Sequence, residues 1–252
     1  MIPKVIHYCW FGGNPLPESA QKCIASWRKF LPDYEIKEWN ESNFDVNAIP
    51  YTAQAYAAKK YAFVSDYARF SILYDNGGLY FDTDVEVIRP MDDIIENGPF
   101  MGFEIDASGI DFKKAVAPGL GLGANPGLGL YKEILEHYKT FSFLNEDGSL
   151  NQTTVVSYIT DILIDNGLEN KPGIQHVAGL TIYPKEYFNP LDSLTGKLKI
   201  TENTRSIHWY TMSWLDRSPF KTWCSHMLHR LISPAITSKV KNLIFGKRNG
   251  QR

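Results

Sequence analysis

The 252-residue sequence predicts an α/β fold, in which helices pack on a central sheet. Short apolar runs typical of buried strands stand at residues 5–8, 35–39, 79–81 and 100–103. Two longer segments with apolar residues at helical spacing lie among them, at residues 19–31 and 61–75. Strands that alternate with helices are the order expected of such a sheet. With 44% hydrophobic residues and no recognisable linker, the chain can bury one substantial core.

The first predicted strand, residues 5–8, leads into Trp10 and the glycine pair Gly12-Gly13. Ligands of α/β sheets bind beyond the carboxyl ends of the strands, so Trp10 falls where a ligand is expected. His7 lies inside the strand and is expected to be a hydrogen-bonded core residue rather than a ligand. Trp27, in the helix that follows, is expected to anchor the core.

The helix predicted at residues 61–75 carries two charges among apolar residues. Asp66 and Arg69 lie along one side of this helix with Ala62 and Leu73. They could form a simple local ion pair, because they are three residues apart. Their inward placement favours a functional site, since a buried charge persists only with a partner or a ligand.

A pair of aspartates follows the next predicted strand. Gly77 and Gly78 end the helix, and the aromatic run 79–81 leads to Asp82 and Asp84, whose side chains are expected on one face. Two carboxylates at this spacing form an oxygen-rich pocket that suits Mg²⁺ or Mn²⁺. An Asp-x-Asp is also common in solvated turns, but the buried strand before it and the charged helix favour a metal site.

Further helices are predicted in the rest of the chain. Asp92 and Asp93 are typical of the start of a helix. Residues 128–165 have a helical pattern, and the run 151–154, Asn-Gln-Thr-Thr, is typical of the opening of the second helix in that region.

Three blocks of the sequence resemble a known enzyme family. The central block contains Ser65-Asp66, Arg69, Leu73-Tyr74, Gly77-Gly78, Tyr80 and Asp82-Thr83-Asp84. A second block runs through residues 2–13 and continues in Ser26-Trp27-Arg28, Asp33-Tyr34-Glu35 and Ser42-Asn43, and a third holds His208-Trp209 and Ser213-Trp214. Together they resemble the glycosyltransferases that contain a DXD motif, and more closely glycosyltransferase family 32, which includes bacterial capsule and lipopolysaccharide enzymes and yeast mannosyltransferases. The large clostridial glucosylating toxins share much of the same pattern.

The resemblance implies a glycosyltransferase A-type fold, a Rossmann-like mixed central sheet flanked by helices, in a catalytic domain at residues 1–216. It implies that Trp10 stacks on the nucleotide base, which suits a flat aromatic ring beside a glycine turn. Asn43 is placed where related enzymes contact the base or the ribose. Ser213 and Trp214 resemble the loop that closes over the diphosphate.

The same resemblance assigns the catalytic and metal-binding roles. Asp66 would accept hydrogen bonds from the hydroxyls of the donor sugar, and Arg69 would neutralise the diphosphate. Asp82 would touch the ribose and the sugar and contribute to the metal site, and Asp84 would ligate the Mn²⁺ or Mg²⁺ ion. His208 resembles the late ligand that completes the metal site in many relatives.

The implied function is a metal-dependent, retaining glycosyltransferase that moves a hexose from a nucleotide sugar to a saccharide or lipid-linked oligosaccharide, in the synthesis of surface polysaccharide or lipopolysaccharide. A UDP-hexose is the favoured donor, with GDP-mannose as the alternative. No position stands out as a nucleophile, which favours same-face attack within an ion pair over a covalent intermediate. Residues 128–165 are expected on the acceptor side, but the segment Gly119–Gly129 matches the family's acceptor loop only loosely, so the acceptor stays open.

Two other functions remain open. A nucleotidyltransferase of sugar phosphates would normally carry a glycine-rich N-terminal loop followed by a basic residue, and Gly12-Gly13-Asn14-Pro15 has no basic residue nearby. A non-catalytic carbohydrate-binding or membrane-binding relative would be expected to lose its costly charged residues first, yet Asp66, Arg69, Asp82 and Asp84 are all present.

The C-terminal residues 217–252 are predicted to form a basic, amphipathic helical tail. The whole chain carries a net charge of −2, but eight basic and no acidic residues follow Asp216, which leaves −10 for residues 1–216. Apolar residues recur among these basic ones at near-helical spacing, as in helices that lie on anionic membranes. The alternative is that this apolar stripe packs on the catalytic domain.

The expected location is the cytoplasm, with peripheral attachment to the inner face of a bacterial membrane through the tail. No run approaches the roughly 20 apolar residues of a membrane-spanning helix, and Met1-Ile2-Pro3-Lys4 leads into a strand rather than a signal peptide. The three cysteines lack the spacing of a zinc site or a disulfide framework. No nucleic-acid partner is expected, and the sequence leaves the oligomeric state open.

Overall fold

The computed structural model describes residues 1–105, 112–151, 153–193 and 195–211. The chain divides into two compact units, Met1–Pro190 with Ile200–Trp214, and Leu191–Lys199 with Leu215–Arg252. Within the second unit, the described residues include an isolated bridge between Leu191 and Leu198. All the helices and strands below belong to the first unit. The predicted tail at residues 217–252 and the predicted site residues Ser213 and Trp214 lie outside the described residues.

A mixed seven-stranded sheet forms the centre of the first unit, with the strand order β2-β1-β3-β6-β5-β8-β7. Its strands are β1 (Val5–Cys9), β2 (Glu35–Trp39), β3 (Gly78–Tyr80), β5 (Phe100–Gly102), β6 (Leu122–Ala124), β7 (Gln175–Val177) and β8 (Leu180–Tyr183). β1 is parallel to both β2 and β3, whereas β6 is antiparallel to β3 and to β5. Because β3 and β5 are both antiparallel to β6, β5 runs in the same direction as β1 and β3. A separate antiparallel pair joins β4 (Val85–Val87) to β9 (Ser206–His208).

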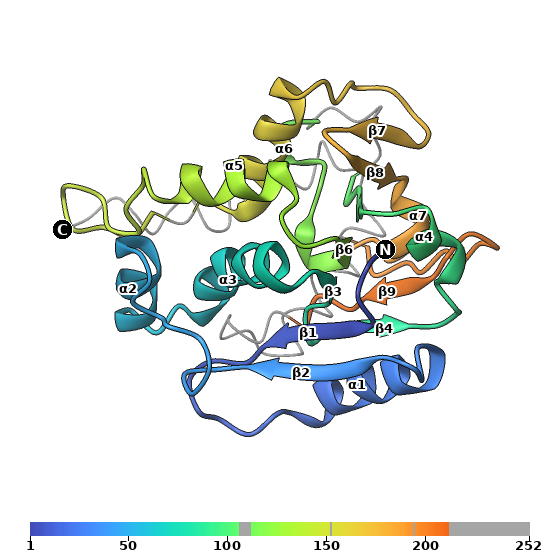
Figure 1. Cartoon of the computed structure of the whole chain (residues 1–252), viewed down its shortest axis with the longest axis horizontal. Helices are drawn as coiled ribbons and strands as arrows, with labels where there is room; N and C mark the ends of the chain where they lie inside the picture. Colours follow the sequence, from blue (N-terminus) through green and yellow to red (C-terminus); the bar gives the residue numbers. More distant parts are fainter. Residues whose placement is uncertain (106–111, 152, 194, 212–252) are drawn as a thin grey trace. The chain divides into compact units, whose positions relative to one another are not determined.

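Helices cover both faces of this sheet (Figure 1). They are α1 (Glu18–Phe30), α2 (Pro50–Ala57), α3 (Tyr61–Asn76), α4 (Asp92–Glu96), α5 (Gly129–Tyr138), α6 (Val155–Asp165) and α7 (Lys185–Phe188), with short 3₁₀ turns at Phe112–Lys114 and Pro118–Leu120. α1 packs on one face, and α3 packs on the other together with α5 and α6. The mixed central sheet flanked by helices, which the sequence and its resemblance led us to expect, is confirmed.

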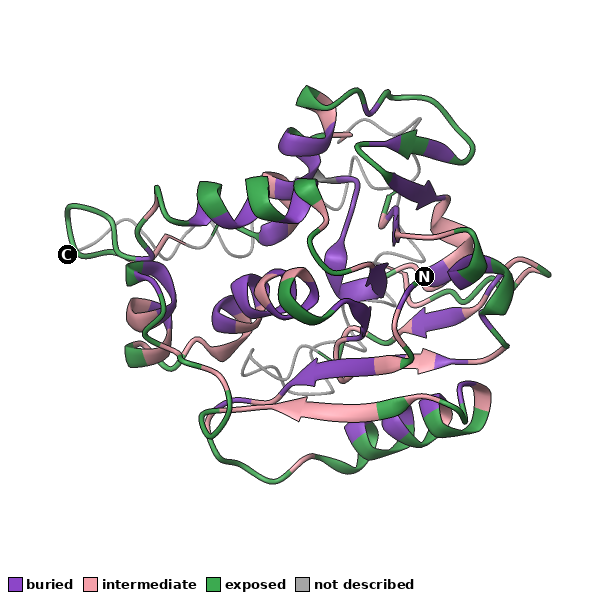
Figure 2. Ribbon diagram, in the orientation of Figure 1, coloured by how far each residue is buried: buried purple, intermediate pink, exposed green. Residues whose placement is uncertain are grey.

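The alternation of side chains along the strands divides the apolar residues between two cores. In β1, Ile6 and Tyr8 join the core that contains Trp27 of α1, whereas Cys9 joins the core beneath α3. Trp27 is fully buried, and its Nε1 donates a hydrogen bond to the carbonyl of Val85 at 2.7 Å, which ties α1 to β4. Trp27 is therefore the core anchor that the sequence predicted. Figure 2 shows β1 buried along most of its length and the edge strand β2 only half-buried.

His7 is also a core residue, as predicted. Its ring is 2% exposed; Nδ1 accepts a hydrogen bond from Trp39 Nε1, and Nε2 lies 3.0 Å from the carbonyl of Gly77. Because Nδ1 is an acceptor, Nε2 carries the proton and donates to Gly77. Burial lowers the pKa of His7 to about 4, against the opposing effect of the hydrogen bond to Gly77, so the ring is neutral at physiological pH.

The elements that the sequence predicted agree in place and type with the structure, with one correction of geometry, whereas α2, α7, β4 and β6–β9 were not predicted. α4 begins at Asp92 as expected, and α6 begins directly after Thr154. β3 ends at Tyr80, so Asp82 and Asp84 lie in a turn and not on a strand, and strand alternation does not bring their side chains together. The turn does so instead, closed by a hydrogen bond from the Val85 N–H to the Asp82 carbonyl at 3.0 Å.

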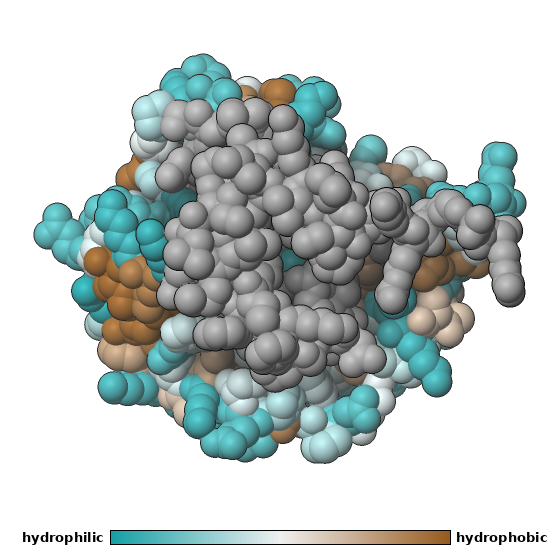
Figure 3. All heavy atoms as spheres, turned by 180° about the vertical axis from the view of Figure 1, so that it is seen from behind, coloured by the Kyte–Doolittle hydropathy of each residue, from teal (hydrophilic) through white to brown (hydrophobic). Residues whose placement is uncertain are grey.

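The described surface is largely polar. In the view from behind, it shows hydrophilic residues with smaller hydrophobic areas between them (Figure 3). Within the described ranges, no helix has both the length and the apolar character needed to cross a bilayer.

Candidate active site

A cavity of about 570 Å³ opens beyond the carboxyl end of β1 and β3. Its walls come from the loop after β1, from α3, from the turn after β3, from the segments around residues 104 and 117–120, from the start of α6 and from the end of β9. Six of the predicted site residues line it: Trp10, Asp66, Arg69, Asp82, Asp84 and His208. This is the sheet edge at which α/β proteins bind their ligands.

Arg69 holds a buried carboxylate, that of Asp66, and a partly exposed one, that of Asp82. Its Nη2 lies 3.0 Å from Asp66 Oδ1 and 3.2 Å from Asp82 Oδ1, and its Nε donates to the carbonyl of Ser65 at 3.2 Å. Asp66 is 9% exposed and Arg69 is 3% exposed, which confirms that both face inward from α3. The guanidinium also lies over the ring of Tyr80, 5.1 Å from its centroid. The local ion pair between Asp66 and Arg69 is thus present, and Arg69 also pairs with Asp82 in the turn after β3.

The charge of Arg69 affects the pKa values of both Asp66 and Asp82. Burial raises the pKa of Asp66 to about 7 and also raises the pKa of Asp82, in both cases against the attraction of Arg69. The pKa of Arg69 is raised, because the surrounding charges of Asp82 and Asp66 outweigh the effect of its burial. Arg69 is therefore a permanent cation that two carboxyl groups share.

Asp82, Asp84 and His208 form a group with the composition of a metal site. One ligand atom from each lies within 4.8 Å of the other two. Asp84 Oδ1 lies 3.1 Å from His208 Nε2, and Asp84 Oδ2 accepts hydrogen bonds from the N–H and the hydroxyl of Thr211 at 2.9 and 3.1 Å. Desolvation opposes the charged form of both groups, but the interaction with His208 lowers the pKa of Asp84, and the charge of Asp84 raises the pKa of His208; each side chain is 15% exposed.

These residues fit a divalent cation. Two carboxylates and one imidazole lie together in the cavity, and carboxylate oxygens are the ligands that Mg²⁺ and Mn²⁺ prefer. His208 Nδ1 is buried and has no hydrogen-bond partner in the described part of the chain. The ring is held through its other nitrogen, the one that faces Asp84.

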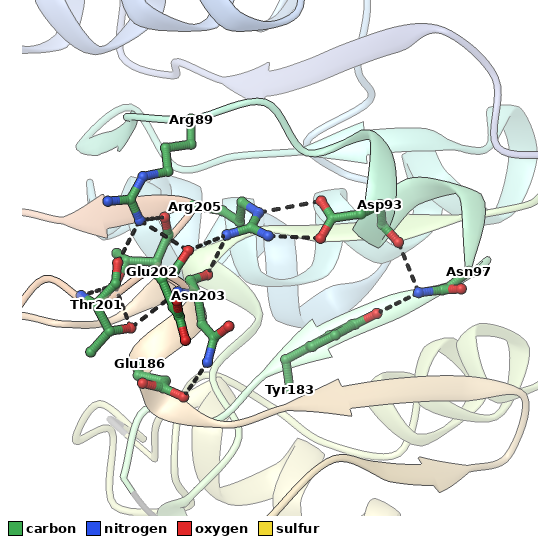
Figure 4. A network of polar contacts seen from close by, with 10 residues as sticks. Arg89, Asp93, Asn97, Tyr183, Glu186, Thr201, Glu202, Asn203 and Arg205 are labelled. Carbon is green, nitrogen blue, oxygen red and sulfur yellow. Dashed lines mark hydrogen bonds and ion pairs between the residues drawn. The ribbon is translucent and has the colours of Figure 1, made fainter.

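The position of His208 depends on contacts far from it in the sequence. β9 pairs with β4 so that His208 lies opposite Val85, directly after Asp84. Arg89 donates hydrogen bonds to the carbonyls of Thr201, Glu202 and Thr204 in the turn that leads into β9 (Figure 4). These bonds fix the start of β9 and so the register that brings His208 to the aspartates.

Gly119 belongs to the part of the cavity wall that lies against Asp82. A Cβ atom at this position would lie 2.3 Å from Asp82 Oδ2 and 3.6 Å from Arg69 Nη1. Any side chain here would displace Asp82, so the glycine is required by close approach. The predicted acceptor-side segment Gly119–Gly129 thus meets the cavity at its beginning, through Gly119 and Leu120.

The loop after β1 places Trp10 at the cavity. Its Nε1 donates to the carbonyl of Asn14 at 2.6 Å, and the N–H of Gly12 donates to Glu41 at 2.6 Å. Gly12 has φ 96°, and a Cβ there would lie 2.3 Å from the ring of Tyr61, so the turn requires glycine.

Asn43 is not brought to the cavity. It is exposed, does not line the cavity wall, and donates from Nδ2 to the carbonyl of Glu38 at 2.9 Å. Its Oδ1 accepts from the N–H of Asn40 at 2.9 Å, so the observed contacts stabilise the turn after β2. Asparagine commonly makes this kind of local bond.

Sequence reasoning missed Glu104 and Tyr210, which also line the cavity. Tyr210 donates to Glu104 Oε1 at 2.9 Å, and its ring centroid lies 4.2 Å from that of His208. Glu104 follows β5 by two residues, and β5 runs parallel to β3. The end of that predicted strand was the signal that could have identified it.

Comparison with known proteins supports the resemblance. Residues 17–101 match the family model described as the glycosyltransferase sugar-binding region containing DXD motif. The matched segment includes Asp66, Arg69, Asp82 and Asp84, and the resemblance stated from the sequence is confirmed over this part of the chain.

Two curated relatives come from Schizosaccharomyces pombe. Inositol phosphoceramide mannosyltransferase 3 is 33% identical over 98 residues, which cover 37% of this chain and 27% of the relative. Inositol phosphoceramide mannosyltransferase 1 is 29% identical over 111 residues, which cover 40% of this chain and 33% of the relative. The matched part of the chain therefore spans a third or less of the length of these relatives.

Three solved structures similar to this chain are named as glycosyltransferases. The PaToxG glycosyltransferase has a TM-score of 0.48 at 18% identity, covering 65% of this chain and 69% of that one. A glycosyltransferase involved in glycosylation of the major capsid of PBCV-1 has a TM-score of 0.47 at 11% identity, covering 91% and 100%. The galactosyltransferase LgtC, in complex with donor and acceptor sugar analogues, has a TM-score of 0.45 at 16% identity, covering 93% and 99%.

Proposed function

We propose that this protein is a metal-dependent glycosyltransferase that moves a hexose from a nucleotide sugar to a saccharide or lipid-linked acceptor. The observation that carries the proposal is the convergence of Arg69, three aspartates and His208 in one cavity at the ligand-binding edge of the sheet. The match of residues 17–101 to a DXD-containing sugar-binding region supports it.

The reaction breaks the bond between the anomeric carbon and a diphosphate oxygen and joins that carbon to a hydroxyl oxygen of the acceptor. Negative charge grows on the departing diphosphate. Arg69, buried and permanently charged, is placed to neutralise it, and such fixed charges act strongly where water is excluded. A divalent cation held by Asp82, Asp84 and His208 would stabilise the same developing charge as a Lewis acid.

The remaining residues of the cavity bind the donor in this proposal. Trp10 stacks on the nucleotide base at one end, where the glycine turn permits close approach. Asp66 accepts hydrogen bonds from sugar hydroxyls, and Asp82 contacts the ribose and the sugar. We propose transfer with retention, by attack on the same face within an ion pair.

The donor is a UDP-hexose or GDP-mannose. Both curated relatives are named mannosyltransferases, which supports mannose as the hexose, and their names also specify an inositol phosphoceramide, which supports a lipid-linked acceptor. Mn²⁺ suits a site of two carboxylates and one imidazole better than Mg²⁺, because an imidazole nitrogen is a softer ligand than oxygen.

The first experiment tests donor turnover. The full chain would be incubated with UDP- and GDP-sugars and Mn²⁺, and release of the nucleoside diphosphate measured with and without EDTA. We expect slow release from at least one donor and its loss with EDTA. Release of pyrophosphate from a nucleoside triphosphate and a sugar phosphate would instead identify the nucleotidyltransferase, and no turnover with any donor would argue against the transferase.

Asp84→Asn provides the matched test of the metal site. The amide keeps the shape and can still accept the hydrogen bonds from Thr211, but it removes the anionic ligand, so we expect turnover to fall by about 10²-fold or more. Asp92→Asn, at an exposed position of α4, removes the same charge away from the cavity and should leave turnover unchanged. Normal Mn²⁺-dependent turnover in Asp84→Asn would contradict the metal role.

A further inference from the structure

Glu104 differs from the other acids of the cavity in its surroundings. Four carboxylates line the described walls. Asp66 and Asp82 share Arg69, and Asp84 lies against His208. Glu104 accepts one hydrogen bond, at Oε1, from the neutral hydroxyl of Tyr210 at 2.9 Å. Among the residues that the structure describes, no cation forms a direct ion pair with Glu104, although its charge acts on His208 from further away, and no hydrogen bond to its Oε2 is seen.

Tyr210 holds this carboxylate in a defined orientation. Its backbone has φ 51°, a left-handed conformation that is rare for a bulky residue and that clusters at functional sites. The Tyr210 hydroxyl accepts from Asn189, so its own proton is directed to Glu104 Oε1. Asn189 Nδ2 donates to the Tyr210 hydroxyl at 2.6 Å and to the Glu104 carbonyl at 3.1 Å, which fixes both partners from behind.

We propose that Glu104 is the catalytic residue that accepts the proton of the acceptor hydroxyl, a role that rests on the proposed function. As the acceptor oxygen bonds to the anomeric carbon, the bond from that carbon to the diphosphate oxygen breaks, and its electron pair leaves on the diphosphate. The hydroxyl proton passes to Glu104 Oε2 and then to water. The other three carboxylates are less suited, because each already forms a direct ion pair with Arg69 or His208 that protonation would break, whereas Glu104 forms none with a described residue.

Glu104→Gln tests the role with little change of shape. The amide can still accept the hydrogen bond of Tyr210 but cannot take up a proton. We expect kcat for transfer to fall by about 10²-fold or more, while the Kd of the nucleoside diphosphate, measured by calorimetry with Mn²⁺, changes less than about twofold. In Glu104→Ala, added formate should restore part of the lost turnover, which a purely structural residue would not show.

Glu38 offers a matched control. It also accepts a hydrogen bond from a tyrosine, Tyr8, at 2.6 Å, but it does not line the cavity. Glu38→Gln should therefore keep kcat unchanged. Tyr210→Phe should lower kcat by about tenfold without changing nucleotide affinity, because Tyr210 positions Glu104, and Tyr8→Phe should have no such effect.

The outcomes separate this inference from the proposed function. If the parent protein turns over a donor and Glu104→Gln keeps kcat within about threefold, the inference is overturned and the transferase stands. A joint loss of kcat and nucleotide affinity, without rescue by formate, would also overturn it, by showing a structural role. A parent protein with no turnover of any sugar nucleotide would overturn the proposed function and this inference with it.

Discussion

At the scale of single residues, Arg69 decides whether the cavity can keep its acids in the charged form. One guanidinium lies within 3.2 Å of two carboxylates that burial would otherwise favour in the neutral form. The attraction between Arg69 and the two carboxylates therefore stabilises the fold less than the loss of Arg69 would destabilise it. An unpaired buried charge costs more than the net contribution of the intact pair.

The Arg69→Met variant tests this argument. It keeps an apolar stem of similar length but leaves Asp66 and Asp82 without their cation, so we expect the free energy of unfolding at pH 7.5 to fall by about 3–5 kcal/mol in urea titrations. Adding Asp66→Asn to Arg69→Met removes one of the two carboxyl groups left without a partner and should recover about 1 kcal/mol or more. Strictly additive losses in the double variant would show that the two side chains do not depend on each other.

At the scale of elements, the short strand β9 brings His208 to the aspartates. β9 is three residues long and pairs only with β4 among the described strands, so its place depends on the turn before it. Arg89 supplies three hydrogen bonds to that turn, whereas Arg205 makes an ion pair with Asp93 at 2.7 Å, in which the Asp93 side chain is 57% exposed (Figure 4). The hydrogen bonds of Arg89 should stabilise the turn more than the ion pair of Arg205 does, because an exposed ion pair contributes about 0–1 kcal/mol.

The Arg89→Ala variant should weaken metal binding from a distance. Three carbonyls of the turn lose their donor, β9 loosens, and we expect the affinity for Mn²⁺, measured by calorimetry, to fall by about tenfold while the protein still folds. Asp93→Ala breaks the neighbouring ion pair and serves as the control, with Mn²⁺ affinity unchanged. Equal affinities in the two variants would mean that the turn does not position His208.

The sequence could reveal residues that belong to a local pattern but not contacts between distant segments. Asp66, Arg69, Asp82 and Asp84 were identified because charges among closely spaced apolar residues are conspicuous in a local pattern. The partnerships of Arg89 with Thr201 and of Glu104 with Tyr210 join segments about a hundred residues apart, and no local periodicity records them. Asn43 was assigned by resemblance alone, and its observed hydrogen bonds are those of a turn.

At the scale of the whole molecule, the charge asymmetry of the chain predicts a membrane interaction. Residues 217–252 carry eight basic and no acidic residues, against −10 for residues 1–216. Each basic residue near an anionic bilayer contributes about 1 kcal/mol, and the attraction weakens with salt. We expect the full chain to sediment with phosphatidylserine vesicles in low salt and a chain ending at residue 216 to stay in solution. Equal sedimentation of the two would remove the proposal of membrane attachment.

The pH dependence of folding gives a second prediction for the whole molecule, through His7. Its pKa is about 4 in the folded protein and 6.5 as an ordinary side chain, so between these values the unfolded chain binds a proton that the folded one does not. The free energy of unfolding should therefore be unaffected by His7 above pH 6.5 and should fall by up to about 3 kcal/mol as the pH drops towards 4. Asp66 contributes to the free energy of unfolding with the opposite sign as the pH falls, because its raised pKa makes the folded protein bind a proton at a higher pH than the unfolded chain does.

The His7→Gln variant separates the two effects. Glutamine can accept from Trp39 and donate to Gly77 as His7 does, but it does not titrate, while Asp66 is unchanged. In urea titrations from pH 7.5 to 4, we expect the free energy of unfolding to fall more steeply in the parent than in the variant. The difference between the two at pH 7.5 should therefore shrink or reverse at low pH. Parallel curves would show that His7 does not enter the folded core as the neutral ring that its hydrogen bonds require.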